Sequence, residues 1–244
     1  MEVYGENLKY IKFNLLKKYE AKIVAGITLR ETDFIHVNPS SETFIDARKS
    51  ICDEFNIEDS SLYFLNQVHG KTLKIVEEDT SNKIEDYDGL ITNCSNKMLL
   101  TCYADCVPII LYDYEKNIVA SVHSGWKGTI AEIGKNAVFT MREKYGSNKE
   151  NIIACIGPSI GGCCFDVGQD VWQKFADKFP TSVEESSEKV DLKKAVKEQL
   201  LNAGIKEENI EVSSICTKCS SDDFYSYRAG DKDKGRFVAF IMIK

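Results

Sequence analysis

Long apolar runs are missing from this sequence. No stretch of about 18 consecutive apolar residues occurs, so the sequence predicts no membrane-spanning helix. The first ten residues, MEVYGENLKY, have neither the basic start nor the apolar centre of a secretory signal peptide. We therefore expect a cytoplasmic protein that does not bind membranes.

Clustered positive charge is also missing. The 31 Lys and Arg residues are outnumbered by 38 Asp and Glu residues, which gives a net charge of −7. A surface that binds nucleic acid needs grouped cations to neutralise phosphates, so we do not expect this function. Any positive groups that matter for function are predicted to be few and local.

Cysteine, in contrast, is abundant, with nine residues. The number is odd, the chain is long enough for an apolar core and no export signal is evident, so a disulfide framework is not expected. Most of the thiols lie in apolar runs and are predicted to pack as small buried side chains. Cys102 and Cys155 are the clearest examples, and we interpret both as structural.

Two short cysteine motifs admit a second interpretation. CTKC spaces Cys216 and Cys219 like half of a zinc knuckle or like a redox pair, but the second half of a knuckle is not apparent nearby. Cys163 and Cys164 are adjacent and follow the turn GPSIGG, which is able to line a pocket. We interpret all four as structural thiols.

Short β-rich runs alternate with segments of helical periodicity. Helices are predicted over residues 41–55, 128–146, 168–179 and 191–204, the last with Asp191 as N-cap and Gly204 as its stop. The alternation indicates an α/β protein with a mixed sheet, in one domain over residues 1–244. The predicted strands cover residues 10–16, 21–29, 61–70, 72–76, 88–92, 97–104, 107–113, 117–123, 151–157, 210–217 and 236–244.

Three candidate metal ligands lie at the ends of predicted strands. His69 ends the strand 61–70, Cys106 directly precedes the strand 107–113, and His123 ends the strand 117–123. Two imidazoles and a thiolate suit zinc, and strand ends are where α/β proteins usually keep their sites. The spacing alone equally allows two hydrogen-bonded core histidines beside a buried thiol.

Two charged residues flank these candidates. SGWKGT follows His123 as a turn into a helix, and the helix-end N–H groups together with Lys127 favour an anion. Asp105 precedes Cys106; we interpret it either as a group that orients a histidine or moves a proton, or as a plain strand-end carboxylate.

Six separated motifs occur in one order that resembles a known family. They are NQVHG, DGLIT, ADCVPIILYD, VHSGWKGT, CIGPSIGGCCFDVG and CTKCSSDDFYSYRAGDKDKGR. Together they resemble the YfiH/YlmD family, formerly called multicopper polyphenol oxidoreductases or laccases. The resemblance runs from about residue 25 to residue 244. It implies layered α/β/α architecture with mixed β-sheets, similar to the catalytic domain of the cytotoxic necrotizing factor.

The resemblance also implies an activity and a set of site residues. Family members are similar to zinc-dependent phosphorylases of adenosine, inosine, guanosine and methylthioadenosine that also deaminate adenosine. The partners implied are purine nucleosides and phosphate, for a monomer or a homodimer. The implied zinc ligands are His69, Cys106 and His123, with Asp105 as a further catalytic group. As substrate contacts we predict Lys127, Arg30 and Arg228, which are candidates for binding phosphate, and Gln67.

The same residues admit three alternative functions. A copper-dependent polyphenol oxidase is an alternative because copper binds nitrogen and sulfur ligands more tightly than zinc. A four-copper laccase is nevertheless excluded, since its sites need several clustered histidines and the chain has three, without a His-x-His pair. A metal-free amide hydrolase, with Cys106 activated by His123, is a second alternative. A non-catalytic role in cell-envelope or division complexes is a third.

Overall fold

The computed structural model describes residues 2–34, 41–184, 187–231 and 234–244. These residues form two mixed β-sheets. The first sheet has five strands in the order β1-β2-β11-β6-β3, and its one parallel pair is β3 with β6. Its strands are β1 (Tyr10–Ile11), β2 (Ile23–Thr28), β3 (Leu62–Tyr63), β6 (Met98–Tyr103) and β11 (Phe237–Ile243).

The second sheet has six strands in the order β10-β9-β7-β8-β5-β4. Its outer pairs are parallel and its central strands are antiparallel, with a turn at residues 114–117 joining β7 to β8. The alternation of elements indicated a mixed sheet, and the family resemblance implied mixed β-sheets in a layered architecture, which the two sheets confirm. The strands here are β4 (Lys74–Val76), β5 (Gly89–Thr92), β7 (Val107–Asp113), β8 (Ile118–Ser124), β9 (Ile152–Ile156) and β10 (Ile210–Val212).

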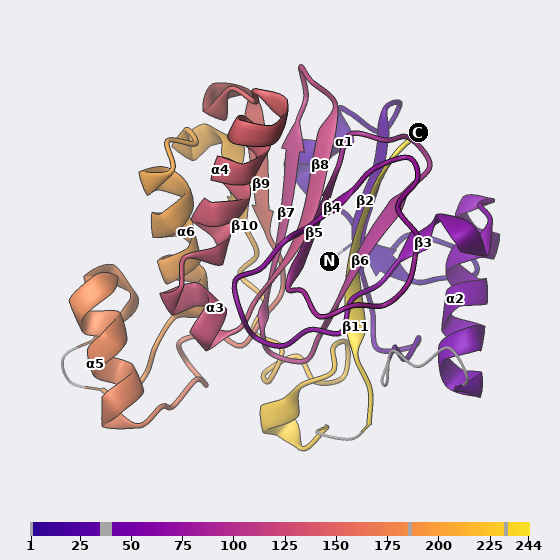
Figure 1. The fold of residues 1–244 in the computed structure, drawn as a ribbon. Coiled ribbons are helices and arrows are strands. Elements are labelled where there is room, and N and C mark those ends of the chain that lie inside the picture. The colour runs from indigo at the N-terminus through magenta and orange to yellow at the C-terminus, as the bar shows by residue number, and fades with distance from the viewer. Residues whose placement is uncertain (1, 35–40, 185–186, 232–233) are drawn as a thin grey trace.

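The two sheets stack face to face, and helices cover their outer faces. Inward side chains of both sheets share one apolar cluster, which includes Leu99 and Phe237 of the first sheet and Ile110 and Val119 of the second. Helix α2 packs on the first sheet, α3, α4 and α6 lie against the second, and α5 lies beside α3 on that same side (Figure 1). The helices thus lie outside the β-sheets, as the family resemblance implies. They are α2 (Glu42–Phe55) on one side and α3 (Trp126–Ile130), α4 (Ile133–Tyr145), α5 (Gln169–Lys178) and α6 (Leu192–Asn202) on the other.

The prediction of one continuous helix over residues 128–146 is wrong, because the helix is interrupted at Glu132. This residue has a φ of 58°, in the left-handed region, and it separates α3 from α4. The buried amide of Gln199 on α6 donates to the carbonyl of Thr129 at 2.8 Å, which satisfies a helix-end acceptor at the break. The predicted apolar face of α4 is present, with Ile133, Ala137, Val138 and Met141 buried.

Other boundaries are set by caps and loops. The Asp191 carboxylate accepts from the N–H groups of Lys193 and Lys194, which confirms it as the N-cap of α6. The predicted strand 10–16 is only two residues long and is followed by helix α1 (Asn14–Lys17). Short 3₁₀ helices complete the secondary structure at Asp59–Ser61, Lys149–Asn151, Pro180–Ser182, Glu207–Asn209 and Tyr227–Ala229. Over the described ranges, no helix combines the length and apolarity needed to span a bilayer.

Candidate active site

Three strand ends meet at one end of the second sheet. Because β8 runs antiparallel to both β5 and β7, its last residues lie beside the first residues of its neighbours: Ser124 pairs with Val107, and Val122 with Gly89. Cys106 directly precedes β7, and His123 is the penultimate residue of β8. Antiparallel pairing therefore brings the thiol and the imidazole together across a sequence separation of 17 residues.

His69 reaches the same place by a different route from the one predicted. The predicted strand 61–70 forms a ladder only at Leu62–Tyr63, and His69 lies in the loop that follows. Its backbone has a φ of 60°, a left-handed conformation that few residues adopt without support. The support is a hydrogen bond of 2.9 Å from its N–H to the carboxylate of Asp88.

The donor atoms of His69, Cys106 and His123 converge. One ligand atom from each lies within 4.8 Å of the other two. The two imidazole rings approach edge to face, with centroids 4.9 Å apart. Two nitrogens and one sulfur at this separation suit a single tetrahedral cation with one coordination position left open.

Asp88 is the residue of the site that sequence reasoning missed. Its carboxylate is fully buried, lies 2.9 Å from Nδ1 of His123, and accepts the N–H groups of His69 and Gly70 at 2.9 and 2.6 Å. A hydrogen bond at Nδ1 leaves Nε2 of His123 as the nitrogen available to a metal. The available signal was its place in DGLIT, directly before a buried strand.

The charges of these groups support one another. Burial by itself would raise the pKa of the Cys106 thiol, but the adjacent imidazoles of His123 and His69 outweigh it and lower the pKa to about 6. For His123, burial opposes the charged form, whereas Cys106 and Asp88 stabilise it and raise its pKa to about 9. The site thus favours a thiolate, which is the form of cysteine that binds metals and attacks electrophiles.

Gly125 provides the room for the three donor residues. A Cβ atom built on it would lie 2.8 Å from Cδ2 of His69 and 3.2 Å from Sγ of Cys106. The first distance is too short for a carbon contact, so any larger residue would displace a donor. The donor set and this closely fitted backbone together fit a zinc ion.

A cavity of about 850 Å³ opens onto the three donors. This volume lies within the range of small-molecule sites. Its walls combine aromatic side chains with polar and cationic groups, which suits a flat, partly polar ligand. The lining residues are Phe34, Leu65, Asn66, Gln67, His69, Cys102, Ala104, Asp105, Cys106, His123, Trp126, Phe165, Tyr227, Arg228 and Arg236.

Asp105 and Gln67 line this cavity, but both side chains are already engaged. The carboxylate of Asp105 accepts from the Thr217 hydroxyl at 2.6 Å and from the N–H of Arg228 at 2.8 Å. It therefore anchors the segment around residues 217–228, and the carboxylate that contacts His123 is that of Asp88. Gln67 bonds the backbone of Cys102 in both directions, at 2.8 and 2.6 Å, which positions its own loop.

The four predicted substrate contacts are distributed unevenly. Gln67 and Arg228 line the cavity, whereas Arg30 and Lys127 are not among its lining residues. Lys127 is exposed on α3, with its Nζ 5.7 Å from the centroid of the Trp126 ring. The guanidinium of Arg30 pairs with Asp231 through contacts of 2.5 and 3.0 Å.

The Arg30–Asp231 pair gives a prediction for stability. The hydrogen bonds from Arg30 outweigh the effect of burial and lower the pKa of Asp231 to about 2, below the ordinary value of an aspartate. The folded state is therefore stabilised above about pH 4, and this contribution is lost as the pH falls towards 2. Asp231→Asn should lower the free energy of unfolding at pH 7 by about 2 kcal/mol, and by roughly half as much at pH 3.

Denaturant titration at both pH values tests this. Asp170→Asn is the matched control, because Asp170 is exposed and its nearest cation, Lys174, lies 3.9 Å away. An equal loss for Asp231→Asn at pH 7 and pH 3 would contradict the ion-pair explanation.

The two cysteines predicted as structural differ in their environment. Cys155 is fully buried between the sheets, and burial raises its pKa well above the ordinary value. Cys102 is half-buried on β6 and lines the cavity, so its complete burial was predicted wrongly. The loss of contact with water still raises the pKa of Cys102 to about 12, which keeps the thiol protonated and unreactive.

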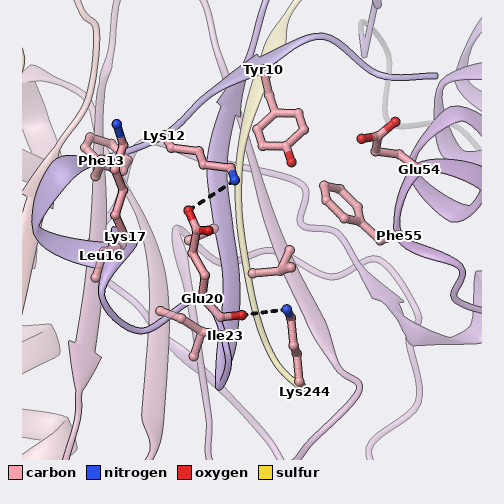
Figure 2. Close-up of a pocket in the computed structure, with 12 residues that line it drawn as sticks. Tyr10, Lys12, Phe13, Leu16, Lys17, Glu20, Ile23, Glu54, Phe55 and Lys244 are labelled. Atoms are coloured by element: carbon pink, nitrogen blue, oxygen red, sulfur yellow. Dashed lines mark hydrogen bonds and ion pairs between the residues drawn. The ribbon is translucent and has the colours of Figure 1, made fainter. Parts of the chain in front are cut away.

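A second, smaller cavity of about 190 Å³ lies between the N-terminal strands, α2 and the end of β11. Figure 2 shows two contacts among its polar groups: Lys12 lies 3.1 Å from the Glu20 carboxylate, and Lys244 donates to the Glu20 carbonyl at 2.6 Å. Its lining within the described ranges includes neither histidine nor cysteine. Over these ranges, this smaller cavity therefore offers none of the nitrogen and sulfur donors found at the larger one.

Comparison with known proteins agrees with this architecture. The purine nucleoside phosphorylase YlmD of Bacillus subtilis is 34% identical over 224 residues, covering 86% of this chain and 81% of that protein. The adenosine deaminase RL5, from an unknown prokaryotic organism, is 29% identical over 86% of this chain and 85% of its own length. The crystal structure of Bacillus licheniformis YfiH matches with a TM-score of 0.85 and 30% identity, over 91% of this chain and 93% of that one.

The family model described as multi-copper polyphenol oxidoreductase laccase matches residues 32–244. This match and the YlmD and YfiH relatives confirm the resemblance carried by the six sequence motifs. The chain therefore belongs to the multi-copper polyphenol oxidoreductase laccase family.

Proposed function

We propose that the protein is a zinc-dependent purine nucleoside phosphorylase that also deaminates adenosine. The observation that carries the proposal is the convergence of His69, Cys106 and His123 on a cavity of about 850 Å³ with aromatic and cationic walls. The relatives named as a purine nucleoside phosphorylase and as an adenosine deaminase support the substrate class.

In this proposal the three donors hold zinc, and Asp88 fixes the tautomer and orientation of His123. When bound, zinc supplies a Lewis acid and lowers the pKa of a coordinated water towards neutrality. Trp126 and Phe165 offer aromatic faces to a purine, while Arg228 and Arg236 offer positive charge to an anion. Copper is the alternative metal for the same donors.

Phosphate binding gives a prediction that separates two candidate cations. Arg228 lines the cavity and its backbone is held by Asp105, whereas Lys127 lies outside the lining residues. A hydrogen bond to a charged group contributes on the order of 1.5–3 kcal/mol. Arg228→Ala should therefore raise the KM for phosphate by about tenfold or more, and Lys127→Ala by less than about twofold. Deamination, which needs no phosphate, should be spared in both.

Initial rates at varied phosphate and saturating adenosine provide the measurement. Arg228→Lys keeps the charge without the planar guanidinium and should lie between the wild type and Arg228→Ala. A larger effect for Lys127→Ala than for Arg228→Ala would instead place the phosphate at the N-terminus of α3.

The decisive experiment for the function is product analysis. Zinc-loaded protein is incubated with adenosine, inosine, guanosine or methylthioadenosine, with and without phosphate, and the products are separated by chromatography. We expect free base and ribose 1-phosphate only with phosphate, and inosine from adenosine without it. No turnover of any of the four nucleosides would overturn the proposal.

A metal-free Cys-His amide hydrolase is the second candidate, and one observation favours it. Cys106, His123 and Asp88 lie next to one another like the nucleophile, the base and the orienting acid of a catalytic triad. The neighbouring imidazoles also lower the pKa of Cys106 to about 6. Chelation separates the two: removal of metal should stop the phosphorylase, whereas it should leave a thiol hydrolase active and sensitive to alkylation.

A further inference from the structure

Four cysteines form a second cluster. Among the described residues, it shares no member with the donor set of the active site. Cys163, Cys164, Cys216 and Cys219 each offer a sulfur, and these four atoms all lie within 4.8 Å of one another. Cys219 lies with its sulfur 3.9 Å from that of Cys163 and 3.4 Å from that of Cys164. In a regular zinc tetrathiolate, zinc–sulfur bonds of about 2.3 Å place the sulfurs about 3.8 Å apart. The cluster is thus close to the size of such a site.

Folding supplies the half of the site that the sequence appeared to lack. Ser159 forms a parallel bridge with Cys216, which brings the loop carrying Cys163 and Cys164 against the CTKC turn. Packing of apolar side chains does not explain the arrangement, because Cys163 and Cys219 are exposed. The interpretation of all four as plain structural thiols therefore accounts poorly for their positions.

The backbone around the cluster is arranged to receive sulfur atoms. The N–H of Gly161 donates to Sγ of Cys216 at 3.2 Å. A Cβ atom on Gly161 would lie 3.2 Å from Sγ of Cys163, so the glycine permits the close approach of two ligands. The backbone at Gly161 thus lies directly against sulfurs of both cysteine pairs.

Positive charge lies near the four sulfurs. The buried Lys193 donates to the carbonyls of Ser213 and Ile215, both at 2.8 Å, directly before Cys216 in the chain. Lys189 donates to the carbonyl of Cys163 at 3.1 Å. Four thiolates around a dication carry an excess of negative charge, and these ammonium groups partly offset it.

The cluster connects two segments that form one wall of the large cavity. Phe165 directly follows the first cysteine pair, while Tyr227 and Arg228 follow the second, and all three line the cavity. Arg228 also donates to the carbonyl of Asp166 at 3.1 Å, across the same junction. A cross-link at the cysteines would hold this wall in place.

We propose that Cys163, Cys164, Cys216 and Cys219 bind one zinc ion as a tetrathiolate, separate from the active-site metal, and thereby fix the wall of the cavity. The proposal does not depend on the reaction that the active site catalyses. A closed set of four protein ligands leaves no open position, so the role of this ion is structural.

Metal content tests the proposal with a variant chosen to fold. Cys163→Ser/Cys219→Ser alters two exposed side chains, and Cys52→Ser, on α2, serves as the matched control. After saturation with zinc and removal of excess metal, mass spectrometry should find about one zinc per chain less in the double variant than in the wild type or the control. The double variant should also release peptides from residues 157–166 faster under limited proteolysis.

Cobalt substitution provides an independent readout. The Cys106→Ala variant, which lacks the sulfur donor of the active site, should still show the strong thiolate-to-cobalt absorption of a four-sulfur site. The Cys163→Ser/Cys219→Ser variant should lose this absorption. Equal zinc content in the wild type and the double variant would overturn the proposal. So would a disulfide between Cys164 and Cys219 in protein purified with zinc, or iron in place of zinc in the cluster.

Discussion

Cys106→Ala should remove the active-site zinc and almost all phosphorolysis and deamination. The thiolate is one of three donors that lie within 4.8 Å of one another, and it alone brings a negative charge to the metal. Loss of a residue that merely orients a ligand typically costs 10–100-fold in metal affinity or activity, so loss of the ligand should cost at least about 100-fold. Zinc content and both activities are measured on the same preparation.

The second cysteine cluster requires a particular background for this experiment. Zinc should be counted in the Cys163→Ser/Cys219→Ser protein, so that only the site at Cys106 contributes. Cys155→Ala is a poor control because Cys155 is buried between the sheets, whereas the half-buried Cys52 on α2 lies outside the site and suits Cys52→Ser. Unchanged zinc content in the Cys106→Ala protein would refute the assignment of this ligand. Retained thiol-dependent hydrolysis in the metal-free wild type, lost with Cys106, would favour the hydrolase.

Asp88→Asn should weaken zinc binding by about 10–100-fold without unfolding the protein. The carboxylate accepts hydrogen bonds at His69 N–H and Gly70 N–H and lies against Nδ1 of His123. An amide has one acceptor oxygen in place of two, so its NH₂ group must face a donor. The variant therefore loosens the His69 loop and loses the negative charge that holds His123 in the required orientation.

Competition between the protein and a chelator of known affinity measures this effect. Asp86→Asn is the matched control, since Asp86 is exposed and its carboxylate accepts the side-chain amide of Asn66 at 2.7 Å. Excess zinc should restore much of the activity of Asp88→Asn, which a purely structural defect would not allow. Wild-type zinc affinity in Asp88→Asn would show that the histidines are oriented without it.

Local patterns were sufficient for most of the secondary structure. The buried strands β7, β8 and β11 and the amphipathic helices α2 and α6 follow from period and capping alone, because those signals lie within a few residues of each other. The left-handed Glu132 that divides α3 from α4 could not be predicted in this way. The residue that hydrogen-bonds the backbone at this break, Gln199, lies 67 residues after Glu132 in the chain. The short ladder at Leu62–Tyr63 likewise depends on which strand lies beside it.

Two findings about the sites came only from long-range pairing. Asp88 and Asp105 are both aspartates at strand ends, and only the register of β5 and β8 shows that Asp88 faces His123. Arg30 has the charge expected of a phosphate contact, yet in the fold its guanidinium is paired with Asp231. The tetrathiolate cluster depends on the bridge between Ser159 and Cys216, which joins residues 57 positions apart.

The sequence by itself determined the α/β class, the family and the residue types able to hold a metal, because periodicity, composition and ordered motifs are properties of the chain alone. The tertiary structure decided that the strands divide into two stacked sheets, that Asp88 orients His123, and that two separate pairs of cysteines meet. These contacts depend on strand register and on loop closure across tens of residues. A shift of one residue in register would turn each side chain to the opposite face of its sheet.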